Sequence, residues 1–187
     1  MVDMASLWLP IALAPVAVFI VSSVIHMATP WHTNDYPKVP DEEKFLNAMR
    51  PLALPPGDYV VPRCDSMAEM KSPEFAAKMN AGPVLVMTVR PNGMPNMGKT
   101  LGQWFLSSVV VTLLAAHVAA ISLAPGANHA VVFHVIWETA FAGYAFALWP
   151  IAIWYGRAWG TTLRGTVDGL LYALITGALF AWAWPQG

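Results

Sequence analysis

The sequence predicts an all-α membrane protein with four transmembrane helices and a small α+β cytoplasmic insertion between the first two. Hydrophobic residues make up 57% of the 187 residues and charged residues only 11%, whereas soluble domains carry roughly 25% charged residues. Four long apolar stretches divide the chain, and most of its polar residues lie between the first and second of them. A chain of this composition cannot cover a soluble surface, so we expect it to lie in a bilayer.

Each of the four apolar stretches is long enough to be a transmembrane helix, because about 20 apolar residues cross the hydrocarbon core. None shows the period-2 alternation of membrane β-strands. Prolines at positions 10, 15 and 150 lie inside the stretches, where membrane helices tolerate them and often kink. The expected spans are residues 5–27, 101–123, 130–155 and 166–184.

The basic residues predict the orientation of the spans. All ten Lys and Arg residues lie between spans one and two or between spans three and four. Lys99, Arg157 and Arg164 are closest to span ends and carry most weight, because basic residues near spans favour the cytoplasmic side. We therefore expect a multi-pass protein of the cell membrane with both termini outside.

The segment 28–100 is expected to fold as a small cytoplasmic module between the first span (1–27) and the three later spans (101–187). Acidic residues after Pro40 start a predicted helix that runs to about residue 50. A second helix is predicted over 72–82, and short strands over 59–61 and 84–89. About 70 residues form only a marginal core, so we expect this module to rest on other structure.

Charge and cysteine content exclude several classes of function. The formal net charge of −1 offers no basic surface for nucleic acid. Cys64 is the only cysteine, which excludes an intrachain disulfide and a thiolate metal cage. Cys64, Met67 and Met70 have spacing suited to Cu(I), although methionines of this kind more often fill a core.

The segment from Gly93 to Thr100 matches the phosphate-binding P-loop pattern, with Gly98 and Lys99 in the required places. The helix that follows is a predicted membrane span, and no acidic residue ends a second apolar strand to hold magnesium. We therefore expect Lys99 to bind a lipid phosphate at the helix N-terminus rather than a nucleotide. Bound membrane lipid is the ligand that this segment favours.

Three polar side chains inside the predicted spans form the main candidate site. His117 lies about nine residues before the middle of the hairpin between spans two and three, and His134 and Glu138 lie about seven and eleven residues after it. At 1.5 Å per residue these side chains have similar depth. Such a cluster could bind a divalent metal or haem, transfer protons, or hydrogen-bond helices together.

A second polar group lies at the predicted cytoplasmic end of the spans. Arg164 and Asp168 are four residues apart on one helix face and are expected to neutralise each other. His26 ends the first span at similar depth, and Trp31-His32 and Asp35-Tyr36 just beyond it are typical of an interfacial collar.

Two functions remain open from the sequence. The favoured hypothesis is a small accessory or scaffold subunit without enzymatic activity, bound to other membrane subunits or to itself through small residues on its helices. The alternative is a metal- or haem-binding redox or proton-transfer protein centred on His117, His134 and Glu138. The small residues expected to pack are Ser107, Ser108, Ala115, Ala116, Ala119, Ala120, Ala140, Gly143, Gly165 and Gly169.

Overall fold

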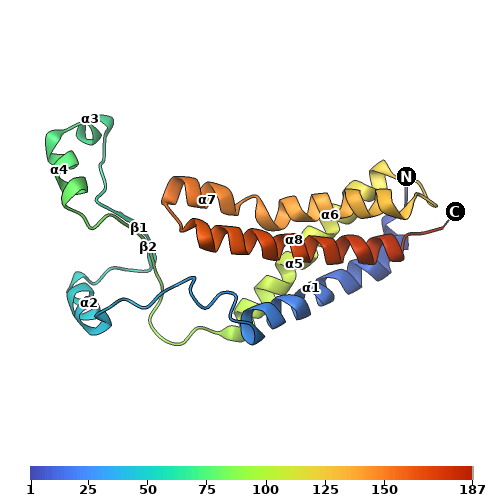
Figure 1. Cartoon of the computed structure of the whole chain (residues 1–187), viewed down its shortest axis with the longest axis horizontal. Helices are drawn as coiled ribbons and strands as arrows, with labels where there is room; N and C mark the ends of the chain where they lie inside the picture. Colours follow the sequence, from blue (N-terminus) through green and yellow to red (C-terminus); the bar gives the residue numbers. More distant parts are fainter. Residues whose placement is uncertain (187) are drawn as a thin grey trace. The chain divides into compact units, whose positions relative to one another are not determined.

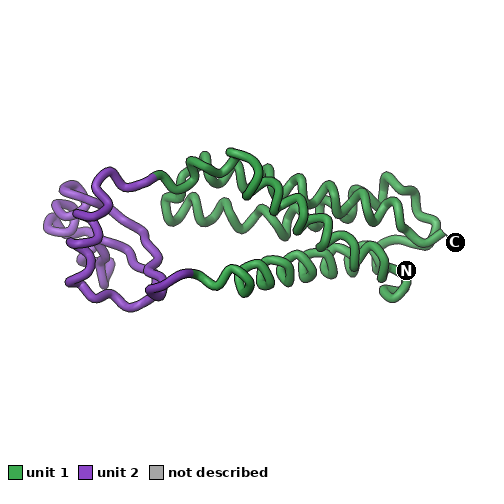
Figure 2. Tube along the Cα trace, turned by 90° about the horizontal axis from the view of Figure 1, so that it is seen from below, with its two compact units in different colours: residues 1–37, 95–187 green, residues 38–94 purple. Residues whose placement is uncertain are grey.

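The computed structural model describes residues 1–186 and divides the chain into two compact units (Figure 2). The first unit combines residues 1–37 with the chain from Pro95 onward, and the second is Lys38–Met94. Each unit has its own secondary structure and is described separately.

The first unit is helical and contains four helices long and apolar enough to cross a membrane, as the sequence predicts (Figure 1). The fourth of these helices begins at Trp159 rather than at the predicted residue 166, so Arg164 lies inside it. The first of these begins with a short 3-10 helix, and the third consists of two consecutive helices. The elements are η1 (Met4–Leu7), α1 (Trp8–Ala28), α5 (Met97–Ser122), α6 (His129–Ala145), α7 (Leu148–Tyr155) and α8 (Trp159–Trp182).

The third span is interrupted between α6 and α7, where Pro150 removes a backbone donor. A residue at position 150 would normally donate its N–H to the carbonyl of Phe146, but proline has none. The Trp149 N–H donates to Phe146 O instead, at 3.3 Å, in the tighter pattern of a 3-10 turn. Pro15, by contrast, lies inside α1 without ending it.

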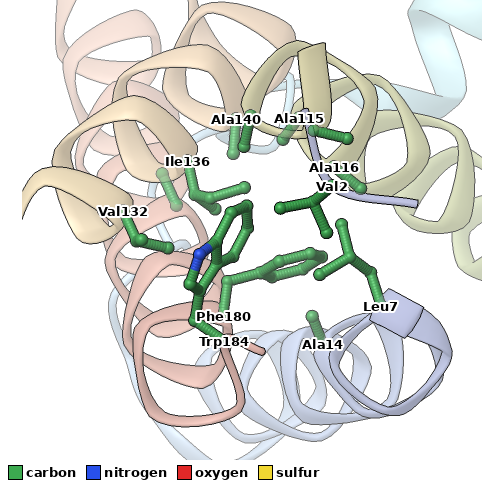
Figure 3. Close-up of a cluster of buried hydrophobic side chains, with 13 residues drawn as sticks. Val2, Leu7, Ala14, Ala115, Ala116, Val132, Ile136, Ala140, Phe180 and Trp184 are labelled. Atoms are coloured by element: carbon green, nitrogen blue, oxygen red, sulfur yellow. The ribbon is translucent and has the colours of Figure 1, made fainter. Parts of the chain in front are cut away.

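The helices pack as a ring of neighbours, because α1 and α6 each contact both α5 and α8. The core near the chain ends joins small alanines of α5 to larger side chains, among them Leu7, Ile136 and Phe180 (Figure 3). The two chain ends are fixed by hydrogen bonds from Val2 N to Ala120 O (2.8 Å) and from Trp184 Nε1 to Ala124 O (3.1 Å).

Small residues allow α8 to approach α6 closely. Gly169, Ala173 and Gly177 recur every fourth residue and lie on one face of α8. A Cβ added at Gly177 would lie 2.9 Å from Trp137 Cβ, and one at Gly169 would lie 3.1 Å from Ala145 Cβ. The distance at Gly177 leaves no room for a side chain, and that at Gly169 would require the neighbouring residue to shift by a few tenths of an ångström, so the two glycines permit the close approach of the helices.

The second unit is the predicted α+β module. Its two strands pair antiparallel from Gly57 opposite Val89 to Val61 opposite Leu85, and Asp41 and Ser72 cap the helices that the sequence predicts. No residue of 38–94 is buried, consistent with a marginal core. The elements are α2 (Glu42–Met49), η2 (Arg50–Leu52), β1 (Gly57–Val61), α3 (Met67–Met70), α4 (Pro73–Ala81) and β2 (Leu85–Val89), of which η2 and α3 were not predicted.

Candidate metal centre

The loop that follows α1, residues 29–37, is tied to α8 by side-chain contacts. The Trp31 indole donates its N–H to Asp168 Oδ1 at 3.0 Å. His32 Nε2 lies 2.8 Å from Asp168 Oδ2. The Arg164 guanidinium donates from Nε to Asp35 Oδ1 at 2.6 Å, and its Nη2 contacts the same oxygen. The loop therefore gathers polar groups against one end of α8.

Two carboxylates of this cluster are buried. The side chains of Asp35 and Asp168 are only 8% and 6% exposed. Burial alone would raise the pKa of Asp35, but hydrogen bonds from His32 and Arg164, together with the positive charge of Arg164, outweigh it and lower that pKa. Asp35 is thus an ionised acceptor that orients both of its neighbours.

Arg164 and Asp168 do not neutralise each other as the sequence suggested. Arg164 pairs with Asp35, and Asp168 pairs with His32 and accepts the Trp31 N–H. The helical spacing of four residues permitted a direct pair, but the loop after α1 supplies closer partners to each. The interfacial collar expected over 31–36 is therefore part of a side-chain cluster.

The hydrogen-bond partners of the two histidines assign their tautomers. His26 Nδ1 lies 2.9 Å from the carbonyl oxygen of Ser22, and His32 Nδ1 lies 2.7 Å from Asp35 Oδ2. Both oxygens can only accept, so each Nδ1 carries the hydrogen. In a neutral imidazole the other nitrogen, Nε2, then holds a free lone pair.

This assignment leaves two acceptors facing each other. His32 Nε2 and Asp168 Oδ2 are 2.8 Å apart, yet the nitrogen is buried and forms no hydrogen bond of good geometry. A buried acceptor pair at this distance needs a positive charge between or beside the two atoms. That charge is either a second proton on His32 or a cation.

His26 completes a set of three ligands. Its ring stacks on His32 with centroids 4.3 Å apart and planes at 12°. One ligand atom from each of His26, His32 and Asp168 lies within 4.8 Å of the others. Among residues 1–186, these three form the group of His, Cys, Asp and Glu side chains arranged to hold a metal ion.

The residues present fit a transition-metal ion. Two imidazoles and one carboxylate form a ligand set used for zinc and for iron(II). Metal-bound histidines usually donate their second ring N–H to a carbonyl or carboxylate, as His26 and His32 do here with Ser22 and Asp35. Three protein ligands would leave coordination positions open to other molecules.

A cavity of about 550 Å³ adjoins two of these ligands. His26 and Asp168 lie on its wall, beside three aromatic side chains that contact one another, Trp104, Tyr144 and Tyr172. The Trp104 indole donates to Ser22 Oγ at 2.9 Å. The remaining lining residues are Ser22, Ser23, Met27, Met97, Thr100, Leu101, Leu148, Gly165 and Gly169.

The intramembrane site predicted from the sequence is brought together only in part. His134 Nδ1 lies 3.4 Å from Glu138 Oε1, on the outer face of α6, with side chains 62% and 61% exposed. The Trp137 indole donates to the same His134 nitrogen at 3.2 Å. His117 is exposed on α5 and joins no three-residue ligand group among residues 1–186.

The P-loop-like segment forms a capped helix start. α5 begins at Met97, and Asn96 Oδ1 accepts the Lys99 N–H at 3.0 Å. The Thr100 N–H is bound to the Asn96 carbonyl at 3.1 Å. These two amides are therefore occupied by protein acceptors, while lipid-phosphate binding by the Lys99 side chain stays a prediction.

Sequence reasoning placed His32 and Asp35 at an interface and missed their joint role with Asp168. One signal was available: two of the five histidines of the chain, His26 and His32, lie six positions apart at the end of the first span. Asp168 is also an acid within a predicted span, where unpaired charge is costly. What the sequence could not supply was the path of the loop that joins them.

No family model, curated protein or solved structure matches this chain. Its function must therefore be argued from the chemistry of the cluster.

Proposed function

We propose that this chain is a membrane protein that binds one divalent transition-metal ion, zinc or iron(II), through His26 Nε2, His32 Nε2 and Asp168. The observation that carries this proposal is the 2.8 Å approach of His32 Nε2 to Asp168 Oδ2 while His32 Nδ1 is bound to Asp35. A cation relieves the repulsion between these two acceptors and uses the lone pair of His26 at the same time.

The ligand types favour a transition metal over calcium or magnesium. Calcium takes six to eight oxygen ligands, and magnesium prefers oxygen and retains water. Imidazole nitrogen suits zinc, copper and iron instead. Ligand atoms sharing one tetrahedral zinc ion would lie about 3.3 Å apart, given bonds of about 2.0 Å. The His32–Asp168 separation of 2.8 Å needs only a small adjustment, whereas His26, within 4.8 Å of the other two ligands, would move closer as the ion binds.

Metal analysis of the purified protein tests this proposal directly. The protein is isolated without a polyhistidine tag, depleted with chelator, and titrated with Zn²⁺ and Fe²⁺ by calorimetry. One equivalent should bind to the native chain, and His26→Ala or Asp168→Ala should weaken binding at least tenfold. His134→Ala removes a histidine outside the cluster and should leave binding unchanged. Failure of the native chain to bind either ion would refute the proposal.

The proposal places the four long helices across the cell membrane, with residues 28–100 on the cytoplasmic side. Its support is the position of three basic residues: Lys99 in the first turn of α5, Arg157 between α7 and α8, and Arg164 in the second turn of α8. The metal site then lies toward the cytoplasmic side of the bundle, because His26 is in the last turn of α1, His32 is in the loop after it, and Asp168 is in the first half of α8.

An impermeant thiol reagent tests that orientation. In intact cells, Asn128→Cys in a Cys64→Ser background should react, because residue 128 lies in the short loop between α5 and α6. Native Cys64, half-buried and within the 28–100 segment, should react only after lysis. The opposite order of labelling would reverse the topology.

A second candidate function is an accessory subunit of a larger membrane complex, or a self-associating chain. The specific support is the His134–Glu138 contact, whose side chains are exposed on a helix apolar enough to span a membrane. Ionisable side chains within a membrane usually face protein or water, so a neighbouring subunit would provide the missing contacts. Photocrosslinking from position 138 in membranes should then capture a protein, whereas crosslinking to lipid alone would contradict this candidate.

A further inference from the structure

We propose that the open coordination positions of the metal are filled by an amphiphile from the membrane, with an oxygen-donor head on an apolar chain. The head would bind the metal, and the chain would occupy the cavity of about 550 Å³ beside it. This inference rests on the metal site proposed above and names the class of ligand for that site.

The position of the cavity relative to the ligand set is the first argument. His26 and Asp168 line the cavity and are also two of the three metal-ligating residues, while His32 lies outside its wall. An ion held by all three residues would therefore border the cavity. The volume of about 550 Å³ lies within the range of roughly 300–1,000 Å³ that is usual for small-molecule sites.

The chemistry of the wall is the second argument. Beyond the two ligands, the wall carries five hydroxyls and the Trp104 indole. The hydroxyls of Ser22, Ser23 and Thr100 are bonded within the protein, whereas those of Tyr144 and Tyr172 are buried and form no hydrogen bond among residues 1–186. Most of the remaining surface is aliphatic, thioether or aromatic. A fully polar substrate would find few free groups here to replace its water, at a substantial cost, whereas an apolar chain would gain from the same burial.

The rim of the cavity indicates where the ligand comes from. Met27, Met97 and Leu101 line the cavity and are also exposed. All three lie on helices apolar enough to cross a membrane. Apolar rim residues on such helices give a membrane-dissolved molecule direct access, and the metal end of the cavity supplies the polar contact for its head.

A second hollow of about 590 Å³ is a weaker candidate for the same ligand. It is lined by Arg164 and Asp168, by the loop residues Thr29, Pro30 and Trp31, and by apolar residues of α1 and α8. Only Asp168 belongs to the metal-ligating set, so a molecule there would meet one ligand of the ion rather than two.

Hydroxamates of different chain length test the inference, because the hydroxamate group binds metal ions through oxygen. Octanohydroxamic acid carries six more methylene groups than acetohydroxamic acid. Each fully buried methylene contributes about 0.8 kcal/mol, so burial of only two predicts that the long-chain probe binds the zinc-loaded protein at least tenfold more tightly. Binding of both probes should disappear after chelation.

Substitutions in the cavity distinguish specific binding of octanohydroxamic acid from its partition into the detergent micelle. Leu101→Trp adds a bulky ring at the cavity wall and should abolish the chain-length advantage while the bound zinc is retained. Leu106→Trp is the matched control, because Leu106 is exposed on the same helix and lies outside the cavity. Ser23→Trp provides a second filled cavity should Leu101→Trp fail to fold.

The outcomes distinguish the two proposals. If zinc binds but octanohydroxamic acid binds no more tightly than acetohydroxamic acid, the amphiphile site is refuted and the metal site stands. If the chain-length advantage persists in both filled variants, the chain lies elsewhere and the cavity assignment is overturned. If the native protein binds no metal, the metal site fails and this inference fails with it.

Discussion

The His32 cluster beside α8 and the His134–Glu138 contact on α6 join the same kinds of group in opposite surroundings. In the cluster, Asp35 and Asp168 are almost fully buried, and each has at least two partners. In the α6 contact both side chains are about 60% exposed, and among residues 1–186 the only further partner is Trp137. Burial and the number of partners, rather than residue type, therefore separate a candidate site from a surface contact.

The two regions also differ in how the contact arises. His134 and Glu138 meet because residues four apart share a helix face, which any α-helix provides. His32 and Asp168 meet across 136 positions of sequence because the loop after α1 folds onto α8. A contact of the second kind depends on the tertiary structure, and loss of one member should disturb several others.

The largest expected effect is therefore the loss of Asp168. In the metal-free protein a second proton on His32 supplies the charge between His32 Nε2 and Asp168 Oδ2. Asp168→Ala then removes the acceptor of this proton and of the Trp31 N–H, and the metal-free protein should lose about 3 kcal/mol of stability, since breaking buried charged contacts is costly. Denaturant titration in detergent micelles measures it. Asp168→Asn, which keeps an acceptor oxygen, should lose less. Equal losses of stability in the two variants would show that the hydrogen bonds accepted by residue 168 do not hold the 29–37 loop against α8.

Metal binding should change the stability by a slightly smaller amount, and it should act at the His32 cluster rather than at the His134–Glu138 contact. Zn²⁺ at one hundred times its dissociation constant should stabilise the native chain by about 2.7 kcal/mol, because it binds only the folded cluster. At the same zinc concentration the shift should persist in His134→Ala and fall to about 1.4 kcal/mol or less in His26→Ala, whose affinity is expected to be at least tenfold lower. A shift that survives in His26→Ala but vanishes in His134→Ala would move the metal site to α6.

The sequence predicted the four long helices and the small α+β module because both depend on local patterns. Span length, acidic first turns and capping residues such as Asp41 and Ser72 are readable within a few positions. The break at Phe146 was less visible, since proline within a membrane helix can be tolerated, as Pro15 is in α1.

The candidate site was predicted less well, for a physical reason. Depth matching along a hairpin identifies side chains at one level but not the directions in which they point. His117 has the depth of His134 yet is exposed on a separate helix. His32 and Asp35 lie in a loop without periodicity, so no pattern could show that they meet Asp168 and Arg164.

The close contact between α8 and α6, the helix that carries His134 and Glu138, should be sensitive to the addition of a single methyl group. Gly177→Ala places a Cβ about 3 Å from Trp137 Cβ and from the Phe133 ring and carbonyl, and such overpacking typically costs about 1–3 kcal/mol. Gly102→Ala is the matched control, because nothing lies within 4 Å of its added Cβ. That control should be neutral or slightly stabilising, since alanine favours helix. A neutral Gly177→Ala would mean that α6 can shift without cost.

The smallest expected effect on stability is at Glu138, because its contact with His134 is exposed. An exposed ion pair contributes at most about 1 kcal/mol and often much less, so Glu138→Ala should change the stability of the detergent-solubilised monomer by less than about 0.5 kcal/mol. The measurement is the same denaturant titration used for Asp168→Ala, paired with light scattering to establish the oligomeric state. A loss as large as that of Asp168→Ala would mean that the pair is covered in the purified protein. Light scattering would then show whether a second copy of the chain buries the pair. If it does, α6 forms an interface, and the His134–Glu138 contact is buried like the His32 cluster.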